Sequence, residues 1–434
     1  MSDPRKILGQ SPMTAKQVLA IGLCVLLNAL DGFDVLSISF ASPGIAKEWG
    51  IDRAALGIVL SMELIGMGVG SVLLGQVTDR FGRRATTIGC LFVMAIGMIS
   101  TTQVGSIGAL AASRLFTGFG IGGMLVTTNA LVAEYANDKW RGSAVAIMAA
   151  GYPVGGIIGG AIASNLLKTG DWRDVFFLGA GITALCLPLV PLFAPEPVGS
   201  LLHRRPADTL AKVNASMRAL GHDAIGELPP VDPEAPRAHI AELFRPGLAM
   251  ITVLLTAAYF LHVLTFYFIL KWVPKIVVDM GFSPSAAGGV LVWANVGGLI
   301  GGLLFSMLSL RFTLRGLLIG AMLASVVMIN VFGQGQADLH GLSIAAAMGG
   351  FCTNAGMVGL YAITAASFPT SVRGGGTGFV IGVGRGGAAL SPVLAGFLFQ
   401  SGLGLATVAM VMAGGSLLGA FALVMLPKRV AEGN

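Results

Sequence analysis

Residues 75–84 read GQVTDRFGRR and separate two long apolar stretches, 55–77 and 85–104. The segment combines glycines with one acid and several arginines: Gly75, Asp79, Arg80, Gly82, Arg83 and Arg84. Lys and Arg at the end of an apolar segment hold that end on the cytoplasmic side of a membrane. Anchoring explains the positive charge, but it explains neither the acid nor the spacing of the glycines. The segment therefore predicts a specifically built loop between two membrane helices.

The composition of the whole chain agrees with a membrane protein. Of 434 residues, 55% are hydrophobic and 11% are charged, whereas soluble domains carry about 25% charged residues. In water such a chain would expose large apolar patches. The 63 glycines fit a membrane protein, because small residues let membrane helices approach closely. The four cysteines lie in apolar stretches without metal-ligand spacing, so neither a metal nor a cofactor is expected.

Twelve stretches are long and apolar enough to cross a bilayer, which takes about 20 residues. They are residues 17–41, 55–77, 85–104, 108–132, 143–167, 174–194, 247–271, 286–309, 314–333, 341–366, 375–399 and 403–427. The expected fold class is all-α and integral to the membrane, with twelve transmembrane helices in two pseudo-symmetric six-helix bundles. The bundles would comprise residues 1–194 and 247–434.

The segment between the bundles, 195–246, is rich in proline and charge and is expected to be a cytoplasmic linker. Within it, apolar residues recur at helical spacing: Leu210, Val213, Met217 and Leu220. This pattern predicts a short amphipathic helix on the inner membrane surface.

The distribution of charge predicts the orientation. With the N-terminus inside, most of the 27 Lys and Arg residues fall in segments on the cytoplasmic side. The outer segments would hold Lys47, Arg53, Lys168, Arg173, Lys271 and Lys275. Because positive charge is enriched on the cytoplasmic side, both termini are expected in the cytoplasm.

Internal repetition supports two halves. Residues 134–142 read EYANDKWRG and residues 367–374 read SFPTSVRG, so both segments place an Arg-Gly pair before a glycine-rich helix. Parallel repeats with a site at their interface are typical of one large class of secondary transporters.

The 75–84 loop resembles the G-x-x-x-D-R-x-G-R-[RK] signature of the major facilitator superfamily at every fixed position. Residues 114–122, RLFTGFGIG, are similar to that family's R-x-x-x-G-x-G motif, and the glycine-rich run 151–160 looks like its helix-5 motif. Residues 31–34, DGFD, resemble the D-G-[FY]-D of the aromatic acid:proton symporters, whose members import benzoate-like and hydroxybenzoate-like acids into bacteria. The second-half loop 306–316 departs from the pattern, because it lacks the acid.

The resemblance implies a transporter rather than an enzyme, in the bacterial inner membrane, working as a monomer. Its partners would be a small aromatic carboxylate, protons and the lipid bilayer, without nucleic acid. Two alternatives remain open: a proton-coupled carrier of another organic anion, such as a sugar acid or an aliphatic acid, and a drug/proton antiporter.

Asp31 and Asp34 are the first candidates for proton coupling. At i and i+3 they share one helix face, and a charge inside a membrane helix costs roughly 2.5–3.5 kcal/mol, which marks it as functional. Two close carboxylates in a low dielectric do not ionise together readily, so the pair could take up a proton outside and release it inside. The alternative is that one Asp only hydrogen-bonds neighbouring backbone or an arginine. Glu63 is a third titrating group, an outer gate residue, or an acid paired within the N-terminal half. Arg114 is expected to bond helix backbone or couple to an acid of the first helix.

An aromatic carboxylate needs a cation in place of its water shell. Arg385 is favoured as that cation, because its planar guanidinium matches a carboxylate. A permanent ion pair with Asp31 or Asp34 is the alternative. Further substrate contacts are expected from Asp34, Asn129, Tyr259, His262, Phe266, Trp293 and Asn354. Packing or helix linkage is the alternative for the aromatic and amide side chains, and a hydrogen-bonded core position is the alternative for His262.

The resemblance also implies a cytoplasmic gate. Its residues would be Gly75, Asp79, Arg80, Gly82, Arg83, Arg84, Glu134, Arg141 and Arg373. Asp79 is expected against the positive N-terminal end of the helix that begins near Gly374. Together with Arg–Glu pairs, that contact would hold the inner side closed until substrate and proton favour the other state.

Overall fold

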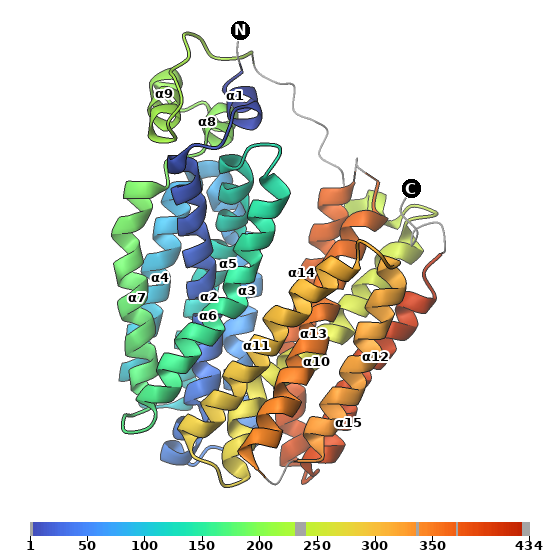
Figure 1. Cartoon of the computed structure of the whole chain (residues 1–434). Helices are drawn as coiled ribbons and strands as arrows, with labels where there is room; N and C mark the ends of the chain where they lie inside the picture. Colours follow the sequence, from blue (N-terminus) through green and yellow to red (C-terminus); the bar gives the residue numbers. More distant parts are fainter. Residues whose placement is uncertain (1–2, 231–239, 336–337, 370–371, 428–434) are drawn as a thin grey trace. The chain divides into compact units, whose positions relative to one another are not determined.

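Twelve helices of the computed structural model are long and apolar enough to cross a membrane (Figure 1). They are α2 (Ala15–Trp49), α3 (Arg53–Phe81), α4 (Arg83–Gln103), α5 (Ile107–Tyr135), α6 (Arg141–Leu166), α7 (Arg173–Phe193), α10 (Ala249–Asp279), α11 (Pro284–Leu308), α12 (Leu314–Gly333), α13 (Leu339–Ser367), α14 (Arg373–Gln400) and α15 (Leu405–Val424). The structure describes residues 3–230, 240–335, 338–369 and 372–427, and among these none lies in a strand. The predicted all-α membrane fold with twelve spans is confirmed.

Several helices extend beyond their predicted ends, and two of them do so by eight residues. α2 continues through Pro43 to Trp49, and α10 continues through Pro274 to Asp279. The prediction ends α10 at Lys271 and counts this residue among the outer segments. The assignment of Lys271 to an outer segment is wrong, since the residue lies inside α10 with a fully buried side chain.

The residues group into two compact units. The first comprises Met1–Val35, Ile65–Gly155 and Phe176–Ala235, and the second comprises Leu36–Leu64, Gly156–Val175 and Pro236–Asn434. The residues of α2 and α3 that flank their connecting loop therefore belong to the same unit as α10–α15. The predicted division into bundles at 195–246 stays a prediction.

Glycines set the closest helix contacts within each unit. In the first unit, a Cβ at Gly32 of α2 would collide with the backbone of Tyr152 on α6. In the second unit, a Cβ at Gly297 of α11 would collide with the backbone of α13 at Ala347. Without side chains at these positions, the helix backbones lie in direct contact, as membrane helices favour.

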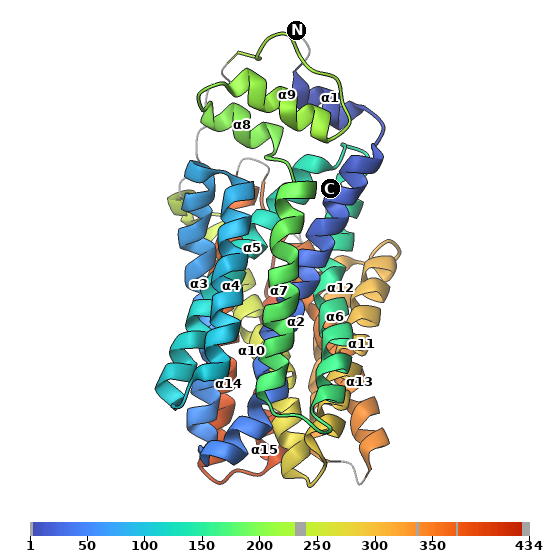
Figure 2. The ribbon, with the colours of Figure 1, turned by 90° about the vertical axis from the view of Figure 1, so that its left-hand side faces the viewer.

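The linker contributes two short helices, α8 (Val198–Arg204) and α9 (Thr209–Ala219). Together with α1 (Pro4–Gln10) they gather beyond one end of the membrane helices of the first unit (Figure 2). The apolar residues Val213, Met217 and Leu220 are fully or almost fully buried in the protein. An amphipathic helix is present as expected, but its placement on the membrane surface is wrong, because protein rather than lipid covers its apolar face.

Candidate functional site

A buried carboxylate pair lies in the middle of α2. Asp31 is 1% exposed and Asp34 is fully buried. The contact between Gly32 and α6 fixes the helix at this level. Neither carboxylate oxygen of Asp31 has a hydrogen-bond partner among the described residues. An ionised carboxylate in such surroundings is costly unless a proton or a cation compensates its charge.

Arg114 of α5 joins four helices beside this pair. Its Nη2 donates to the backbone carbonyl of Asp34 at 3.3 Å, and its Nη1 donates to the sulfur of Met98 on α4 at 3.3 Å. The guanidinium also lies 5.1 Å from the ring centroid of Phe176 on α7. Arg114 thus bonds helix backbone, as the sequence predicted, and it stands next to a buried acid.

The side chain of Asp34 points toward α7. A Cβ at Gly179 would lie 3.2 Å from Asp34 Oδ1 and 2.9 Å from the terminal methyl of Met98, so a larger residue there would press on both side chains. Together Asp31, Asp34 and Arg114 form a buried charged trio in the first unit. The trio has a net charge of minus one when all three members are ionised.

The second unit holds Arg385 on α14, next to a pair of tyrosines. Gly384 packs against the ring of Tyr259 on α10, whose hydroxyl donates to the Tyr361 hydroxyl of α13 at 3.1 Å. Arg385 itself is partly buried. Among the described residues of its unit, no acid lies within ion-pair range of its guanidinium.

His262 is a bridge between three helices. Its Nε2 donates to the carbonyl of Thr353 on α13, and its Nδ1 accepts from the hydroxyl of Ser416 on α15, each at 2.9 Å. The side chain is fully buried. This geometry is the hydrogen-bonded core position that the sequence left as the alternative to a substrate contact.

The other predicted substrate contacts differ in their exposure and in the groups that they contact. Trp293 of α11 is 54% exposed, and Asn129 is exposed and donates to a carbonyl of its own helix at 2.7 Å. Phe266 packs edge-to-face on its neighbour Tyr267. Asn354 links α13 to α11 through a 2.6 Å bond to the carbonyl of Gly298. Their substrate roles stay predictions.

A buried ion pair that the sequence did not suggest joins α3 to α10. Lys271 Nζ lies 3.4 Å from Glu63 Oε2, and both side chains are fully buried. One partner of Glu63 therefore comes from α10, and the alternative that Glu63 pairs within the N-terminal half stays a prediction. The signal that could have found it is the apolar run after Lys271, which indicates that the helix continues.

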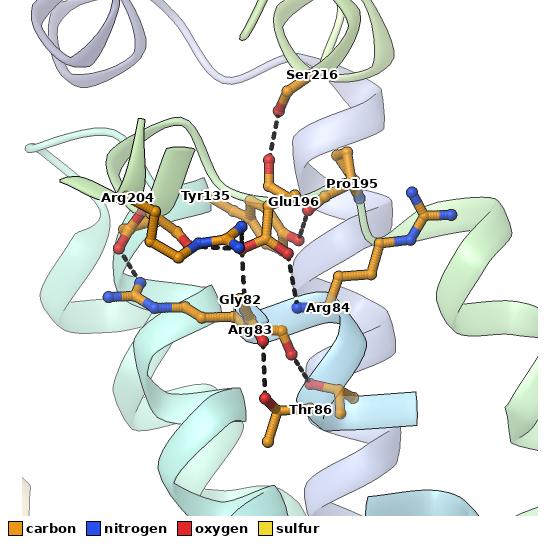
Figure 3. A network of polar contacts seen from close by, with 12 residues as sticks. Gly82, Arg83, Arg84, Thr86, Tyr135, Pro195, Glu196, Arg204 and Ser216 are labelled. Carbon is orange, nitrogen blue, oxygen red and sulfur yellow. Dashed lines mark hydrogen bonds and ion pairs between the residues drawn. The ribbon is translucent and has the colours of Figure 1, made fainter. Parts of the chain in front are cut away.

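Of the predicted 75–84 loop, residues 75–81 belong to α3 and residues 83–84 to α4, so the turn is confined to Gly82. An acid of the linker holds this turn (Figure 3). Glu196 accepts from the backbone N–H groups of Arg83 and Arg84 at 2.9 and 3.0 Å, and Arg204 of α8 lies 3.3 Å from the same carboxylate. Ser216 of α9 donates to the carbonyl of Glu196 at 2.8 Å. A carboxylate at a helix N-terminus neutralises the helix dipole and satisfies free N–H groups. No local sequence motif marks Glu196, so its role could not be predicted from the sequence.

Two of the predicted gate residues of the first unit contact each other, and two more contact other residues of that unit. Arg83 forms an ion pair with Glu134 at the end of α5. Arg84 donates to the carbonyl of Pro191 at 2.9 Å, and Arg141 pairs with Asp138 at 2.7 Å.

The other predicted gate residues are described by their backbone conformation, their exposure or a bond to a nearby residue. Gly82 has a φ of 99°, which favours glycine at the turn into α4. Asp79 and Arg80 are exposed, and a Cβ at Gly75 would meet open space. In the second unit, Arg373 donates to the carbonyl of Phe368 at 3.3 Å. The predicted contact of Asp79 with the helix beginning near Gly374 stays a prediction.

The sequence matches the family described as Major Facilitator Superfamily over residues 24–329 and 255–434. The chain belongs to this superfamily. It is therefore a multi-pass membrane protein of a transporter superfamily rather than an enzyme. Among solved structures, this transporter is similar to a D-xylose-proton symporter, with a TM-score of 0.74 at 18% identity, covering 96% of this chain and 99% of the other. The inward open xylose transporter XylE from E. coli gives a TM-score of 0.73 at 16% identity, covering 95% and 98%. At such identities the likeness shows the fold alone.

Curated relatives match the transporter over almost its whole length. It is 29% identical to the 3-(3-hydroxy-phenyl)propionate transporter of Escherichia coli (strain K12), with 96% of each chain covered. It is 27% identical to the gallate transporter of Pseudomonas putida, covering 93% of this chain and 90% of the relative. The 4-hydroxybenzoate transporter PcaK of the same species is 26% identical, with 89% and 87% covered.

Proposed function

We propose that this transporter imports a small, hydroxybenzoate-like aromatic carboxylate together with protons across the inner membrane of a bacterium, with both termini in the cytoplasm. The observation that carries the proposal is the buried carboxyl of Asp31, next to Asp34 and Arg114, in a chain whose relatives are named as transporters of hydroxylated aromatic acids. Most Lys and Arg residues fall in segments on the same side of the membrane as the N-terminus. Because positive charge is enriched on the cytoplasmic side, the N-terminal end of α2 faces the cytoplasm.

Asp31 is the proposed proton carrier. The trio of Asp31, Asp34 and Arg114 has one more negative than positive charge, and a low-dielectric interior strongly favours neutrality. A single proton supplies the missing positive charge. Asp34 has the guanidinium of Arg114 at its own backbone, so Asp31 is the member that most needs the proton.

Arg385 is the proposed partner of the substrate carboxylate. Among the residues of its unit that the structure describes, no acid pairs with its partly buried guanidinium. A planar guanidinium can bind a carboxylate through two parallel hydrogen bonds. The hydroxyls of Tyr259 and Tyr361 lie 3.1 Å apart nearby and are suited to a ring hydroxyl. Apolar and aromatic side chains of α10 would contact the ring.

The transport step would be alternating access, in which substrate and proton together bind one state more tightly than the other. The ion pair of Arg83 with Glu134 and the exposed Asp79 would belong to the cytoplasmic gate.

Uptake of radiolabelled 4-hydroxybenzoate and a panel of related acids into cells that express the chain tests the proposal. Protonophore-sensitive uptake is expected for the wild type, and loss of uptake for Asp31→Asn and Arg385→Ala. Matched controls are Asp223→Asn and Arg311→Ala, because both residues are exposed, and both variants should transport normally.

Two results would redirect the proposal. Uptake of a sugar acid or an aliphatic acid instead, with the protein present in the membrane, would favour a carrier of another organic anion. Greater drug sensitivity of cells that lack the chain would favour a drug/proton antiporter.

A further inference from the structure

The turn between α11 and α12 carries arginines without acids. Its segment 306–316, SMLSLRFTLRG, has no acidic residue. At the corresponding turn of the first unit, Arg83 pairs with Glu134, so the protein itself compensates the charge. In the second unit, Arg315 donates to a backbone carbonyl of α15, whereas the exposed Arg311 makes no ion pair among the residues that the structure describes. Arg311 is therefore available to an anion from outside the chain.

A groove runs from this turn along the membrane helices of the second unit. α11 and α12 each pack on α13 (Figure 1) but make little direct contact with one another, so α13 forms a floor between them. The space between them has a volume of about 670 Å³. We call it the α11–α12 groove, and its lining includes Leu304 and Leu308 of α11, Gly320 and Ala324 of α12, and Phe351 of α13.

The α11–α12 groove is polar at one end only. Among its lining residues, Arg311 and Thr313 have polar side chains, and both belong to the turn where α11 and α12 meet. The other lining residues are glycines and apolar side chains, with the buried Cys352 counted among the latter. A Cβ at Gly320 would meet nothing within 4 Å, so the groove is open at this point of α12.

The groove opens toward the lipid. Leu304, Gly316 and Gly320 of its lining are exposed. Leu323 and Val327 continue the same face of α12 at helical spacing and are exposed as well. Apolar surface of this kind on a membrane-spanning helix favours contact with acyl chains over contact with water.

Size and charge fit an anionic amphiphile. From Gly316 to Ala324, α12 rises about 12 Å, which lies within the ~15 Å of one membrane leaflet. Cavities of about 300–1,000 Å³ hold drug-sized ligands, so the groove has room for an acyl chain. At its polar end, Arg311 offers a planar guanidinium that binds phosphate through two parallel hydrogen bonds. Basic pockets between membrane helices on the cytoplasmic side bind anionic lipid head groups in this way.

We propose that the α11–α12 groove binds one anionic phospholipid of the cytoplasmic leaflet, with an acyl chain along α12 and the phosphate on Arg311. The inference rests on the proposed function in one respect, because the orientation proposed there places the turn between α11 and α12 on the cytoplasmic side. The lipid supplies the negative charge that this turn lacks, and its chain fills the space between two helices. None of the residues that line the groove is among those proposed to bind the substrate.

Native mass spectrometry of the purified protein measures lipid binding directly. The probes are phosphatidylglycerol and phosphatidylethanolamine with the same acyl chains. The second lipid carries an ammonium group that compensates its own phosphate. The wild type should therefore bind its first phosphatidylglycerol about tenfold more tightly, or better, because a hydrogen bond to a charged group contributes that much.

Three variants test the role of the arginine. Arg311→Gln should lose the preference for phosphatidylglycerol, and Arg311→Lys, which keeps the charge, should retain part of it. The matched control is Arg218→Gln, because Arg218 is an exposed arginine of α9 outside the groove, and it should keep the wild-type preference.

A second pair of variants tests the place of the acyl chain. Gly320→Leu puts a side chain into the open part of the groove and should weaken the binding of both lipids several-fold. Gly181→Leu is its control, because a Cβ at Gly181 of α7 also meets open space, and it should bind both lipids as the wild type does. Phosphatidylglycerol with a photoreactive acyl chain should cross-link to α11, α12 and α13 in the wild type and lose these cross-links in Gly320→Leu.

Several results would overturn the proposal. One is equal affinity of the wild type for the two lipids, and another is an unchanged preference in Arg311→Gln. Cross-links spread evenly over all membrane helices would also overturn it. Loss of the cross-links on addition of 4-hydroxybenzoate would make the groove a site for the aromatic acid, and a dimer that Gly320→Leu dissociates would make it an interface between two copies of the chain. Either result overturns the assignment to lipid.

The lipid measurement and the uptake assay fail separately. Binding to the purified protein needs neither substrate nor a proton gradient. Failure of every aromatic acid to enter the cells would therefore refute the proposed substrate and leave the lipid result unchanged. The normal uptake expected of Arg311→Ala also stands, because the groove is separate from the residues proposed to bind the substrate.

Discussion

The attachment of the linker to α4 should depend on a single carboxylate, that of Glu196. This side chain accepts hydrogen bonds from the first free N–H groups of α4, those of Arg83 and Arg84. It also accepts a hydrogen bond from the Ser200 hydroxyl and forms an ion pair with Arg204. Hydrogen bonds to a charged group contribute about 1.5–3 kcal/mol each, and such values are not additive within one network. Replacing Glu196 by Ala should therefore cost roughly 2–4 kcal/mol of local stability.

A local loss of this size should release α8 and α9 from the first unit. Since each 1.4 kcal/mol is about a tenfold change in an equilibrium, the open population of the linker should rise about 30-fold or more. Limited trypsin digestion of inside-out vesicles measures this directly, because Arg204 lies in α8 and Lys212 and Arg218 lie in α9. Cleavage there should be faster by a similar factor while the membrane helices remain intact.

The matched control is Glu227→Ala, since Glu227 is an exposed acid of the same linker. It should be cleaved at the wild-type rate. Glu196→Gln keeps an acceptor for one N–H group but loses the charge, and it should fall between the wild type and Glu196→Ala. If Glu196→Ala and Glu227→Ala are cleaved equally fast, the carboxylate does not hold the linker and the reasoning is refuted.

Three further predictions concern other parts of the chain. Asp31→Asn should abolish protonophore-sensitive accumulation but retain exchange of labelled for unlabelled substrate across the membrane, because exchange needs no net proton movement. Loss of both activities together with an intact fold would argue against a proton role. Gly155→Ala should lower the melting temperature in detergent, because its Cβ would collide with the backbone of Ala29 and overpacking costs about 1–3 kcal/mol. Gly181→Ala is the control, because its Cβ meets open space, and it should leave the melting temperature nearly unchanged. Burial holds the pKa of His222 below its ordinary value, although Asp223 opposes this effect. As the pH falls below about 6.5, His222 should therefore take up a proton in the detached linker before it does so in the attached linker, so acid favours detachment. Trypsin cleavage of the linker should accelerate between pH 7 and pH 5.5, and His222→Asn, which cannot titrate, should remove that acceleration.

The membrane helices were predictable from sequence because each must satisfy its own backbone in lipid, which demands long apolar runs. The end of α10 was not predictable, since a lysine can lie inside a membrane helix if a distant acid compensates its charge. That acid, Glu63, is 208 residues away along the chain. Charge alone therefore could not distinguish a buried Lys271 from a loop residue.

The linker illustrates a second limit. The spacing of Val213 and Met217 predicts an apolar helix face, but such a face can pack against lipid or against protein equally well. Only the fold shows that protein covers it. Similarly, an acid in a loop carries no local sign that it will cap a helix that begins 113 residues earlier, as Glu196 does for α4. For the candidate site, the sequence located Asp31, Asp34 and Arg114, but not the helices that surround them.

The contact at Gly32 changes how the tetrapeptide DGFD should be understood. Its glycine is the point at which α2 touches the backbone of α6, so any larger residue would lift α2 away and carry both neighbouring carboxylates with it. A saturation library at position 32 should therefore return almost only glycine, although the chemistry resides in the residues on either side. A search for this tetrapeptide detects a helix crossing as much as a pair of acids, and a transplanted pair of aspartates would need the facing glycine-rich helix to come with it.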